Sequence, residues 1–322
     1  MNEQRASNPP HAPDTTGRIR KLLGSFHVTG VFWFRIHCWG LSFLPDWGVW
    51  IINNVFSAFF FIALRKIRKA ISNNLEVVLG PCGWWHRQRR IWLTMSTFAW
   101  CLSERYESMV TDRPFHFEAD GQDVWRDVTS GDGGLIVVTA HIGHWEIGSR
   151  LPIEHGFRRI HVVREQEMDP KAQEFIRDLV SRTSGDGYEV HFADEKDAAF
   201  GAFLLAALRD GDVVALQGDR PRVKGQNASV RLFDRPFDLP VGPAALARAA
   251  EVPLVPVFVI REGRLRSRAF IRPSIMVERS GDRDADIRIA LQRVAVNVEW
   301  AIRKAPHQWF CFRNLWPESD ES

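Results

Sequence analysis

Hydrophobic positions follow a helical spacing in the first third of the chain. Residues 47–64 (WGVWIINNVFSAFFFIAL) form an apolar run without a charge, and residues 84–109 place apolar side chains at the spacing of one long amphipathic helix. Both segments are therefore predicted to be α-helical. Residues 1–18 instead combine prolines with small polar residues, a pattern typical of a disordered tail and unlike that of a signal peptide.

The pattern changes after residue 110, where short runs rich in valine and isoleucine alternate with helical stretches. This alternation is typical of an α/β domain built around a largely parallel sheet. We therefore expect a disordered tail (1–18), a helical membrane-associating region (19–110) and an α/β domain (111–322). The predicted strands are 135–140, 159–163, 188–192, 212–217, 253–260 and 268–277, and the predicted helices in this part are 174–182, 199–210, 243–251 and 285–304.

The apolar run at 47–64 is the candidate membrane segment of the sequence. Asn53, Asn54 and Ser57 interrupt it near its centre, and amide groups are costly in hydrocarbon. A helix that lies in the membrane interface, or dips into it, is therefore favoured over one that crosses the bilayer. The alternative is a buried core helix of a soluble domain.

Composition and charge favour a membrane surface as a partner over nucleic acid. The formal net charge of +3 is too small to indicate nucleic-acid binding. Four cysteines without a metal-type spacing favour a reducing cytoplasm over a disulfide framework. Many of the 13 tryptophans precede residue 101, and they favour the headgroup region of a bilayer. An anionic membrane surface suits the basic cluster that follows the apolar run, which consists of Arg65, Lys66, Arg68, Lys69, Arg87, Arg89 and Arg90.

Candidate chemistry follows the predicted strand at 135–140. His141 comes directly after it, and Glu146 completes the spacing His-x4-Glu. Ligands of a parallel sheet gather beyond the carboxyl ends of its strands. Histidine is the side chain best suited to accept a proton near neutral pH, and a carboxylate behind it fixes its tautomer. Gly143 would let the backbone approach a substrate closely, so the segment predicts a catalytic base.

Other interpretations of the same segment stay open on the residues alone. His141, His144 and Glu146 could bind a metal ion in a hydrolase, although H-x-x-H-x-E matches no familiar zinc spacing. His141 could activate a protein nucleophile, but the sequence has no G-x-S-x-G elbow. The side chains could also simply pack, with Trp145 as a core aromatic residue, in a non-catalytic membrane-associated protein.

An ordered set of motifs resembles a known family. TAHIGHWEIGSRLP (139–152) resembles the first motif of the lysophospholipid acyltransferase superfamily, His-x4-Asp/Glu, in the glutamate form of the bacterial lipid A biosynthesis late acyltransferases. VVREQEMDPKAQEFIR (162–177) is similar to the second block. Segments 217–225 and 230–263 are similar to the third and fourth blocks, with an aromatic-x-x-Pro element at Phe233 and Pro236, and 302–317 resembles the family's ending. The resemblance covers residues 25–317.

This resemblance implies transfer of a fatty acyl group from acyl-carrier protein or acyl-coenzyme A to a hydroxyl of a lipid acceptor. It implies neither a cofactor nor a metal ion, and no covalent enzyme intermediate. His141 would deprotonate the acceptor hydroxyl, and Glu146 would orient and charge-stabilise the histidine. Arg164 and Arg220 would hold phosphates of the acceptor or donor. The substrate-side residues that the resemblance implies are Gly143, Trp145, Arg164, Asp219, Arg220, Arg235 and Pro236.

Two departures from the family pattern fall on the presumed acceptor side. The chain has Gly218-Asp219-Arg220 where lipid A enzymes often carry Asp-Gln, and Asp234 where they tend to have glycine before Arg-Pro. Asp219 would neutralise Arg220 or simply end its strand. The acceptor is thus lipid A, another glycolipid, an aminolipid or a polyene lipid. The implied location is the cytoplasmic face of the bacterial inner membrane, held peripherally or by a single N-terminal anchor.

Overall fold

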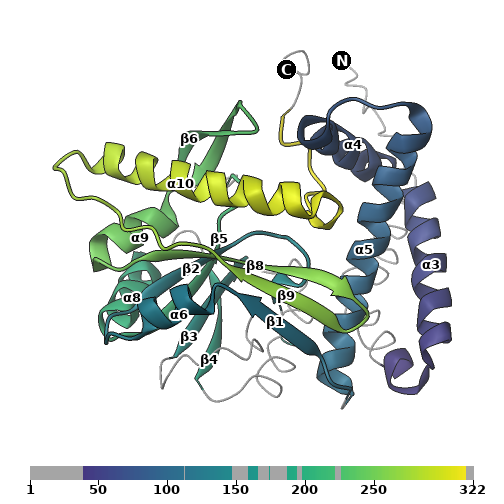
Figure 1. Ribbon diagram of the computed structural model, residues 1–322, viewed down its shortest axis with the longest axis horizontal. Coiled ribbons are helices and arrows are strands. Elements are labelled where there is room, and N and C mark those ends of the chain that lie inside the picture. The colour runs from purple at the N-terminus through teal and green to yellow at the C-terminus, as the bar shows by residue number, and fades with distance from the viewer. Residues whose placement is uncertain are drawn as a thin grey trace, which may run out of the picture.

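A sheet of seven strands forms the centre of the protein (Figure 1). The computed structural model describes residues 39–111, 113–146, 159–165, 174, 187–193, 198–221 and 226–316. The strand order is β1 (His116–Asp120), β9 (Arg266–Ile271), β8 (Leu254–Gly263), β2 (Leu135–Thr139), β5 (Val213–Gln217), β3 (Ile160–Glu165) and β4 (Tyr188–Ala193). Strands β8, β2, β5, β3 and β4 run parallel, whereas β9 is antiparallel to β8 and β1 is parallel to β9. The predicted α/β fold is confirmed.

The strands form where the apolar runs predict them, with one exception. The predictions at 135–140, 159–163, 188–192, 212–217 and 253–260 correspond to β2, β3, β4, β5 and β8. The prediction at 268–277 is too long, because β9 ends at Ile271. Pro273 follows and cannot donate a ladder hydrogen bond, and Ile275 returns for a single bridge with Leu254.

Helices cover both faces of the sheet. Helices α8 (Ala198–Arg209), α9 (Gly242–Ala250) and α10 (Arg283–Lys304) pack on one face, where they share a core with Ile136 and Val138 of β2. Helix α6 (Gln122–Thr129) packs on the other face, where Trp125 contacts the core around Leu135. Successive side chains of a strand point to opposite faces, so a strand buried on both sides has to be apolar throughout.

The helices predicted in this α/β part form where they are described, whereas α6 and strand β1 are not predicted by the sequence pattern. The helices predicted at 199–210, 243–251 and 285–304 are confirmed as α8, α9 and α10. The helix predicted at 174–182 lies outside the described residues, except for Glu174. The disordered tail predicted at 1–18 also lies outside them.

A two-stranded hairpin, which the sequence pattern does not predict, lies beside α10 (Figure 1). It consists of β6 (Asn227–Leu232) and β7 (Arg235–Pro240), paired antiparallel. Phe233 and Asp234 form the turn, with φ of 52° and 58°. A positive φ at both turn positions matches the right-handed twist of a tight hairpin. The backbone N–H of Phe233 donates to Glu299 of α10 at 2.7 Å, which holds the turn against that helix.

Three helices stand together beside the sheet: α3 (Asp46–Ala63), α4 (Arg65–Leu79) and α5 (Trp84–Val110). Helix α5 lies between α3 and the sheet and also contacts the short 3-10 helix η2 (Pro306–Gln308), as Figure 1 shows. The sequence pattern predicts α3 and α5 at 47–64 and 84–109, but it does not predict α4. Helix α4 packs its apolar face on α5 through Ile71 and Leu75.

Helix α3 turns its polar residues inward and its apolar residues outward. Asn53 and Ser57 are buried, and Ser103 of α5 donates a hydrogen bond to Asn53 Oδ1 at 2.8 Å. Val55 and Phe59, on the outer side, keep 62% and 63% of their surface exposed. The alternative of a buried core helix is therefore wrong. Because Asn53 and Ser57 do not face outward, they are a weaker obstacle to a full crossing of the bilayer by α3.

Candidate active site

His141 forms a close side-chain pair with Asp219 at the carboxyl ends of two neighbouring strands. It follows β2 by two residues, Asp219 follows β5 by two residues, and β2 pairs with β5. His141 Nδ1 lies 2.7 Å from Asp219 Oδ1. The indole N–H of Trp309 donates to the other oxygen, Oδ2, at 3.1 Å. Both carboxylate oxygens of Asp219 therefore have partners from distant parts of the chain.

The electrostatics of this pair keep Asp219 ionised. The Asp219 side chain is fully buried, which by itself raises the pKa of the carboxyl group. The charge and hydrogen bond of His141, the charge of Arg220 and the hydrogen bond from Trp309 outweigh this and lower the pKa well below its usual range. An ionised carboxylate can only accept a hydrogen bond, so His141 Nδ1 carries the shared proton. In the neutral imidazole, Nε2 then holds the lone pair that a general base needs.

The backbone after His141 is held by β8 and by the segment that follows α10. The His141 carbonyl accepts from Phe310 N–H at 2.9 Å, and Gly143 N–H donates to the Gln308 carbonyl at 3.0 Å. Gly143 has a φ of 54°, and a Cβ at this position would lie 2.3 Å from the carbonyl oxygen of Val259. The missing side chain at Gly143 thus lets the backbone of β8 approach closely. The sequence pattern predicts close approach of a substrate there instead.

Glu146 forms ion pairs with two arginines, and among the described residues it makes no hydrogen bond with His141. Its Oε1 lies 2.6 Å from Arg164 Nη2 at the end of β3, and its Oε2 contacts Arg105 of α5. Burial would raise the pKa of Glu146, but the charges of Arg105 and Arg164 outweigh it and lower the pKa, with a smaller contribution from His141. Glu146 thus contacts the two arginines, while Asp219 makes the direct contact with His141.

His144 joins the same segment to α5 and β9 through a buried network. Its Nδ1 lies 2.7 Å from Ser267 Oγ, and its Nε2 lies 3.1 Å from Glu104 Oε2. Arg261 of β8 binds both oxygens of Glu104, at 2.8 and 2.9 Å. Burial lowers the pKa of His144 and so favours the neutral ring. Each ring nitrogen lies close to a polar side chain, so His144 has a structural role next to the His141–Asp219 pair.

These contacts do not support a metal site at the His-x4-Glu segment. His141, His144 and Glu146 have three separate sets of partners: a carboxylate, a serine with a glutamate, and two arginines. Within the part of the chain that the structure describes, the histidine, cysteine and carboxylate side chains that converge as metal ligands do so elsewhere, in the β3–β4 region.

Aromatic side chains border His141 on one side. The ring of Trp145 lies 5.4 Å from the imidazole and 5.7 Å from the ring of Phe310, measured between centroids. A small cavity next to them is lined by Phe98, Cys101, Leu102, Arg105, Gly143, His144, Trp145 and Glu146. Trp145 therefore borders both the imidazole of His141 and this small cavity.

The other residues expected on the substrate side divide into two groups. Arg164 and Arg220 lie near the pair: Arg164 holds Glu146, and Arg220 donates to the Phe310 carbonyl and lies 3.9 Å from Asp219 Oδ2. Arg235 and Pro236 instead belong to β7, in the hairpin against α10. Among the described residues, no hydrogen bond or ion pair joins these two to His141.

The comparison with known families identifies the chain. The sequence model of a family described as bacterial lipid A biosynthesis acyltransferase matches residues 21–318. The chain belongs to this family. It is therefore an acyltransferase, and its family implies an acyl donor and a lipid acceptor. A search of curated proteins found no significant match.

Membership of this acyltransferase family settles the alternatives that the residues alone leave open. A metal-dependent hydrolase and a non-catalytic membrane protein are both set aside, because the family's activity is acyl transfer in lipid A biosynthesis. The described part of the chain contains one helix, α3, that is long and apolar enough to cross a membrane. This helix is consistent with membrane association of the acyltransferase.

Sequence reasoning missed several residues around the site. It does not predict Arg105 as a partner of Glu146, Trp309 as a donor to Asp219, or Glu104 as a partner of His144. The sequence contained one indication of these buried contacts. Glu104, Arg105 and Glu107 place three charges close together near the end of a long amphipathic helix. All three are buried, and buried charges are rarely left without partners.

Proposed function

We propose that this acyltransferase moves a fatty acyl group from a thioester donor, acyl-carrier protein or acyl-coenzyme A, to a hydroxyl of a lipid A-type or related glycolipid. His141 is the general base. The observation that carries the proposal is the contact of 2.7 Å between His141 Nδ1 and the buried, ionised Asp219. This contact supports an imidazole whose Nε2 is unprotonated and ready to accept a proton.

The reaction needs one proton relay and no covalent enzyme intermediate. His141 Nε2 takes the proton of the acceptor hydroxyl as its oxygen attacks the thioester carbonyl carbon. The tetrahedral intermediate then collapses, the carbon–sulfur bond breaks, and the imidazolium returns its proton to the leaving thiolate. Asp219 steadies the imidazolium between these two steps, as a buried carboxylate does in a catalytic triad.

Glu146 and its two arginines form the second part of the proposed machinery. The carboxylate adds negative charge near the imidazolium and holds Arg164 beside it. Arg164 and Arg220 each use part of a guanidinium group on protein acceptors, and an arginine carries five N–H donors. The planar guanidinium group is suited to phosphate groups of the donor or the acceptor. In this proposal Glu146 is a positioning residue and Asp219 is the direct partner of the base.

The outer face of α3 is proposed to insert into the membrane. A helix of 18 residues is about 27 Å long, close to the thickness of a bilayer's hydrocarbon core. Trp84 and Trp85 are exposed at the start of α5, and Trp92 of the same helix contacts Phe61 near the end of α3, which the basic start of α4 follows. Basic and aromatic side chains at one end of an apolar helix favour the cytoplasmic face of the inner membrane.

Acyl transfer is tested directly with purified protein. The protein is incubated with acyl-carrier protein thioester or acyl-coenzyme A and with a lipid A precursor, and the products are analysed by mass spectrometry. We expect a lipid heavier by one acyl group, together with release of one thiol. Release of thiol without an acylated lipid would instead indicate a thioesterase, and no turnover with any donor or acceptor would contradict the proposal.

Membrane insertion of α3 is tested with a matched pair of double variants. Val55→Lys with Phe59→Lys places two charges on the exposed face of α3. Ile289→Lys with Val296→Lys places the same charges on exposed apolar positions of α10. We expect the first variant alone to lose cosedimentation with vesicles that contain anionic lipid. Equal loss in both variants would mean that α3 has no special part in membrane binding.

A further inference from the structure

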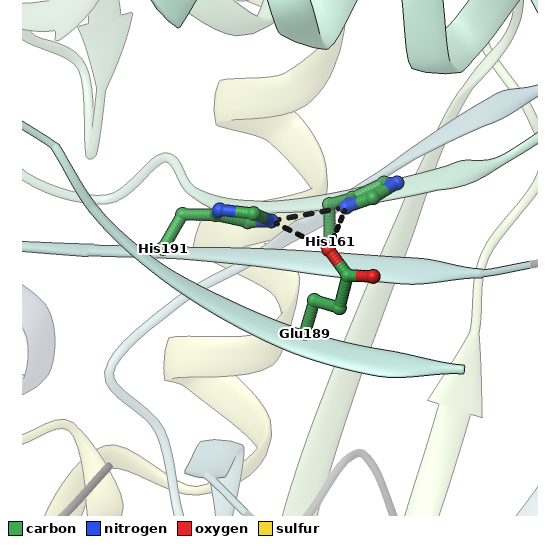
Figure 2. A group of neighbouring side chains, drawn as sticks. All are labelled: His161, Glu189 and His191. Carbon is green, nitrogen blue, oxygen red and sulfur yellow. Dashed lines mark hydrogen bonds and ion pairs between the residues drawn. The ribbon is translucent and has the colours of Figure 1, made fainter. Parts of the chain in front are cut away.

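A second group of polar side chains lies at the β3–β4 edge of the sheet, away from the contacts of His141. His161 of β3 and Glu189 and His191 of β4 point toward one another, as Figure 2 shows. His161 pairs in register with Glu189, and Val163 pairs with His191, so all three polar side chains lie on the same face of the sheet. This is the face that α8 covers, because Phe203 of α8 contacts the rings of both histidines.

The separations within this group match those of metal ligands. His161 Nδ1 lies 3.0 Å from His191 Nε2, and Glu189 Oε2 lies 3.5 Å and 3.6 Å from these two nitrogens. Zinc binds imidazole nitrogen and carboxylate oxygen at about 2.0–2.2 Å, so a tetrahedral site separates its ligand atoms by about 3.3–3.5 Å. Small movements of these side chains would therefore give three ligands of one ion.

The surroundings of His161 are those of a metal-binding histidine. Its second nitrogen, Nε2, lies 3.1 Å from Asp212 Oδ2. Asp212 is itself held in place, because its Oδ1 accepts from the backbone N–H of Arg159 at 3.1 Å. A carboxylate behind a ligating histidine fixes the tautomer and raises the basicity of the ligating nitrogen. Phe200 and Phe203 supply an apolar wall on the other side.

A chain of hydrogen bonds alone accounts for this group less completely. In such a chain His191 Nε2–H would donate to His161 Nδ1, and His161 Nε2–H would donate to Asp212. The nearer oxygen of Glu189 would then lie 3.5 Å and 3.6 Å from the two nitrogens, beyond the usual length of a hydrogen bond. A cation among the three atoms satisfies the carboxylate and both imidazoles together.

We propose that His161, Glu189 and His191 bind one divalent transition-metal ion, for which zinc has the best-matched ligands and geometry. Water completes the fourth position, which the half-exposed Glu189 leaves within reach of solvent. The ion ties β3 to β4. It also steadies β3 on the way to Arg164, three residues further along, which holds Glu146. The ion has a structural role and takes no part in acyl transfer.

Metal binding is tested on the full chain purified without a histidine tag and freed of metal by a chelator. Zinc is titrated against a chromophoric chelator, and thermal unfolding is followed in parallel. We expect one tight equivalent and a rise of Tm by several degrees on zinc addition, because a ligand that binds the folded state stabilises it. Cobalt at the same site is expected to give the visible absorption of a tetrahedral ion.

Four variants assign the ion to this site. His191→Gln and Glu189→Gln each remove one ligand and are expected to abolish the tight equivalent. Asp212→Asn keeps all three ligands and is expected to weaken binding about 10–100-fold. His116→Gln, at an exposed histidine of β1, is the matched control and is expected to bind as the unmodified chain does.

Two results would overturn the proposal. One is the absence of a tight equivalent in the unmodified chain. The other is unchanged binding in His191→Gln and Glu189→Gln, which would place the ion elsewhere. If His191→Gln does not fold, the more exposed Glu189→Gln decides alone. Acyl transfer is not needed for any of these measurements, so their outcome does not depend on the proposed function.

Discussion

Two aspartates flank strand β5, and each contacts a histidine of a neighbouring strand. Asp219, after β5, lies 2.7 Å from His141, and Asp212, before β5, lies 3.1 Å from His161. The two pairs share one chemistry, in which a carboxylate fixes the tautomer of an imidazole. They lie at opposite ends of the same strand, so the fold uses the arrangement twice.

The pairs differ in what the second ring nitrogen faces. His161 is almost fully buried, and its Nδ1 faces a second imidazole and a carboxylate. His141 keeps 18% of its side chain exposed, and within the described residues its Nε2 makes no hydrogen bond. A nitrogen that faces other ligands is suited to a metal ion, whereas one open to solvent is suited to a substrate. The environment, rather than the pair itself, therefore decides the role.

The largest expected effect comes from removing the imidazole of His141 at the carboxyl end of β2. His141→Ala is expected to lower acyl transfer by about 10²–10⁴-fold, the usual contribution of general base catalysis. The rate of formation of acylated lipid by purified protein measures this loss. His116→Ala, at an exposed position of β1, is the control and is expected to keep full activity. Full activity in His141→Ala would remove the base from the proposed mechanism.

The second-largest effect on acyl transfer is expected to distinguish the roles of Asp219 and Asp212. Asp219→Asn is expected to lower acyl transfer by about 10²-fold or more, because an amide can donate to Nδ1 and so favour the wrong tautomer. Asp212→Asn makes the same chemical change at the other end of β5 and is expected to keep most of the activity. Steady-state rates of the two folded variants, measured side by side, test this. Equal losses would mean that the two pairs do not differ in role.

A smaller effect is expected from the second carboxylate near His141. Glu146→Gln is expected to reduce kcat by about ten-fold to 10²-fold, because Arg164 and the charge near the imidazolium would be misplaced. Vesicle binding is expected to stay unchanged, since Glu146 is buried next to α5. Steady-state kinetics give kcat and KM separately. A loss greater than that of Asp219→Asn would make Glu146 the main partner of the histidine.

The smallest expected effect is on stability and depends on pH. The pKa of Asp219 is lower in the folded protein than in the unfolded chain, so the folded state binds a proton there more weakly. Its contribution to stability is complete above the unfolded pKa of about 3.9 and is lost as the pH falls through the folded pKa. We expect Asp219→Asn to cost about 1.5–3 kcal/mol at pH 7, the usual value of a hydrogen bond to a charged group.

This cost is expected to shrink as the pH falls below about 4, since Asp219 of the unfolded chain then binds a proton that the folded state binds more weakly. Thermal or denaturant unfolding of both proteins from pH 7 to pH 3 measures the difference. A cost that is the same at every pH would mean that the charge of Asp219 does not contribute to folding.

The local pattern of apolar and polar residues was sufficient to predict most of the strands and helices. Strands buried on both faces need continuous apolar runs, and LIVVTA and DVVALQ supply them for β2 and β5. The hairpin β6–β7 escaped prediction because its turn is formed by Phe233 and Asp234, without the glycine that usually marks a tight turn. Helix α4 escaped because only one residue, Leu64, separates it from α3, with no proline or glycine between them.

The candidate site was predictable in part. His141 could be located because it directly follows a strand, and the motif spacing pointed to a carboxylate as its partner. The spacing pointed to Glu146, which is near in sequence. The direct contact is made by Asp219, 78 residues away, because β5 lies beside β2 in the sheet. Which strands become neighbours is not encoded in the local pattern of either strand.

By itself, the sequence determined most of the elements, the α/β class, the family and the position of the histidine at a strand end. These depend on residues close together in the chain, where periodicity and motif spacing are direct physical signals. The tertiary structure decided which carboxylate touches His141, which face of α3 is exposed, and that His161, Glu189 and His191 converge. Each of these depends on strand order and helix packing, which are set by the burial of the whole chain rather than by any one segment.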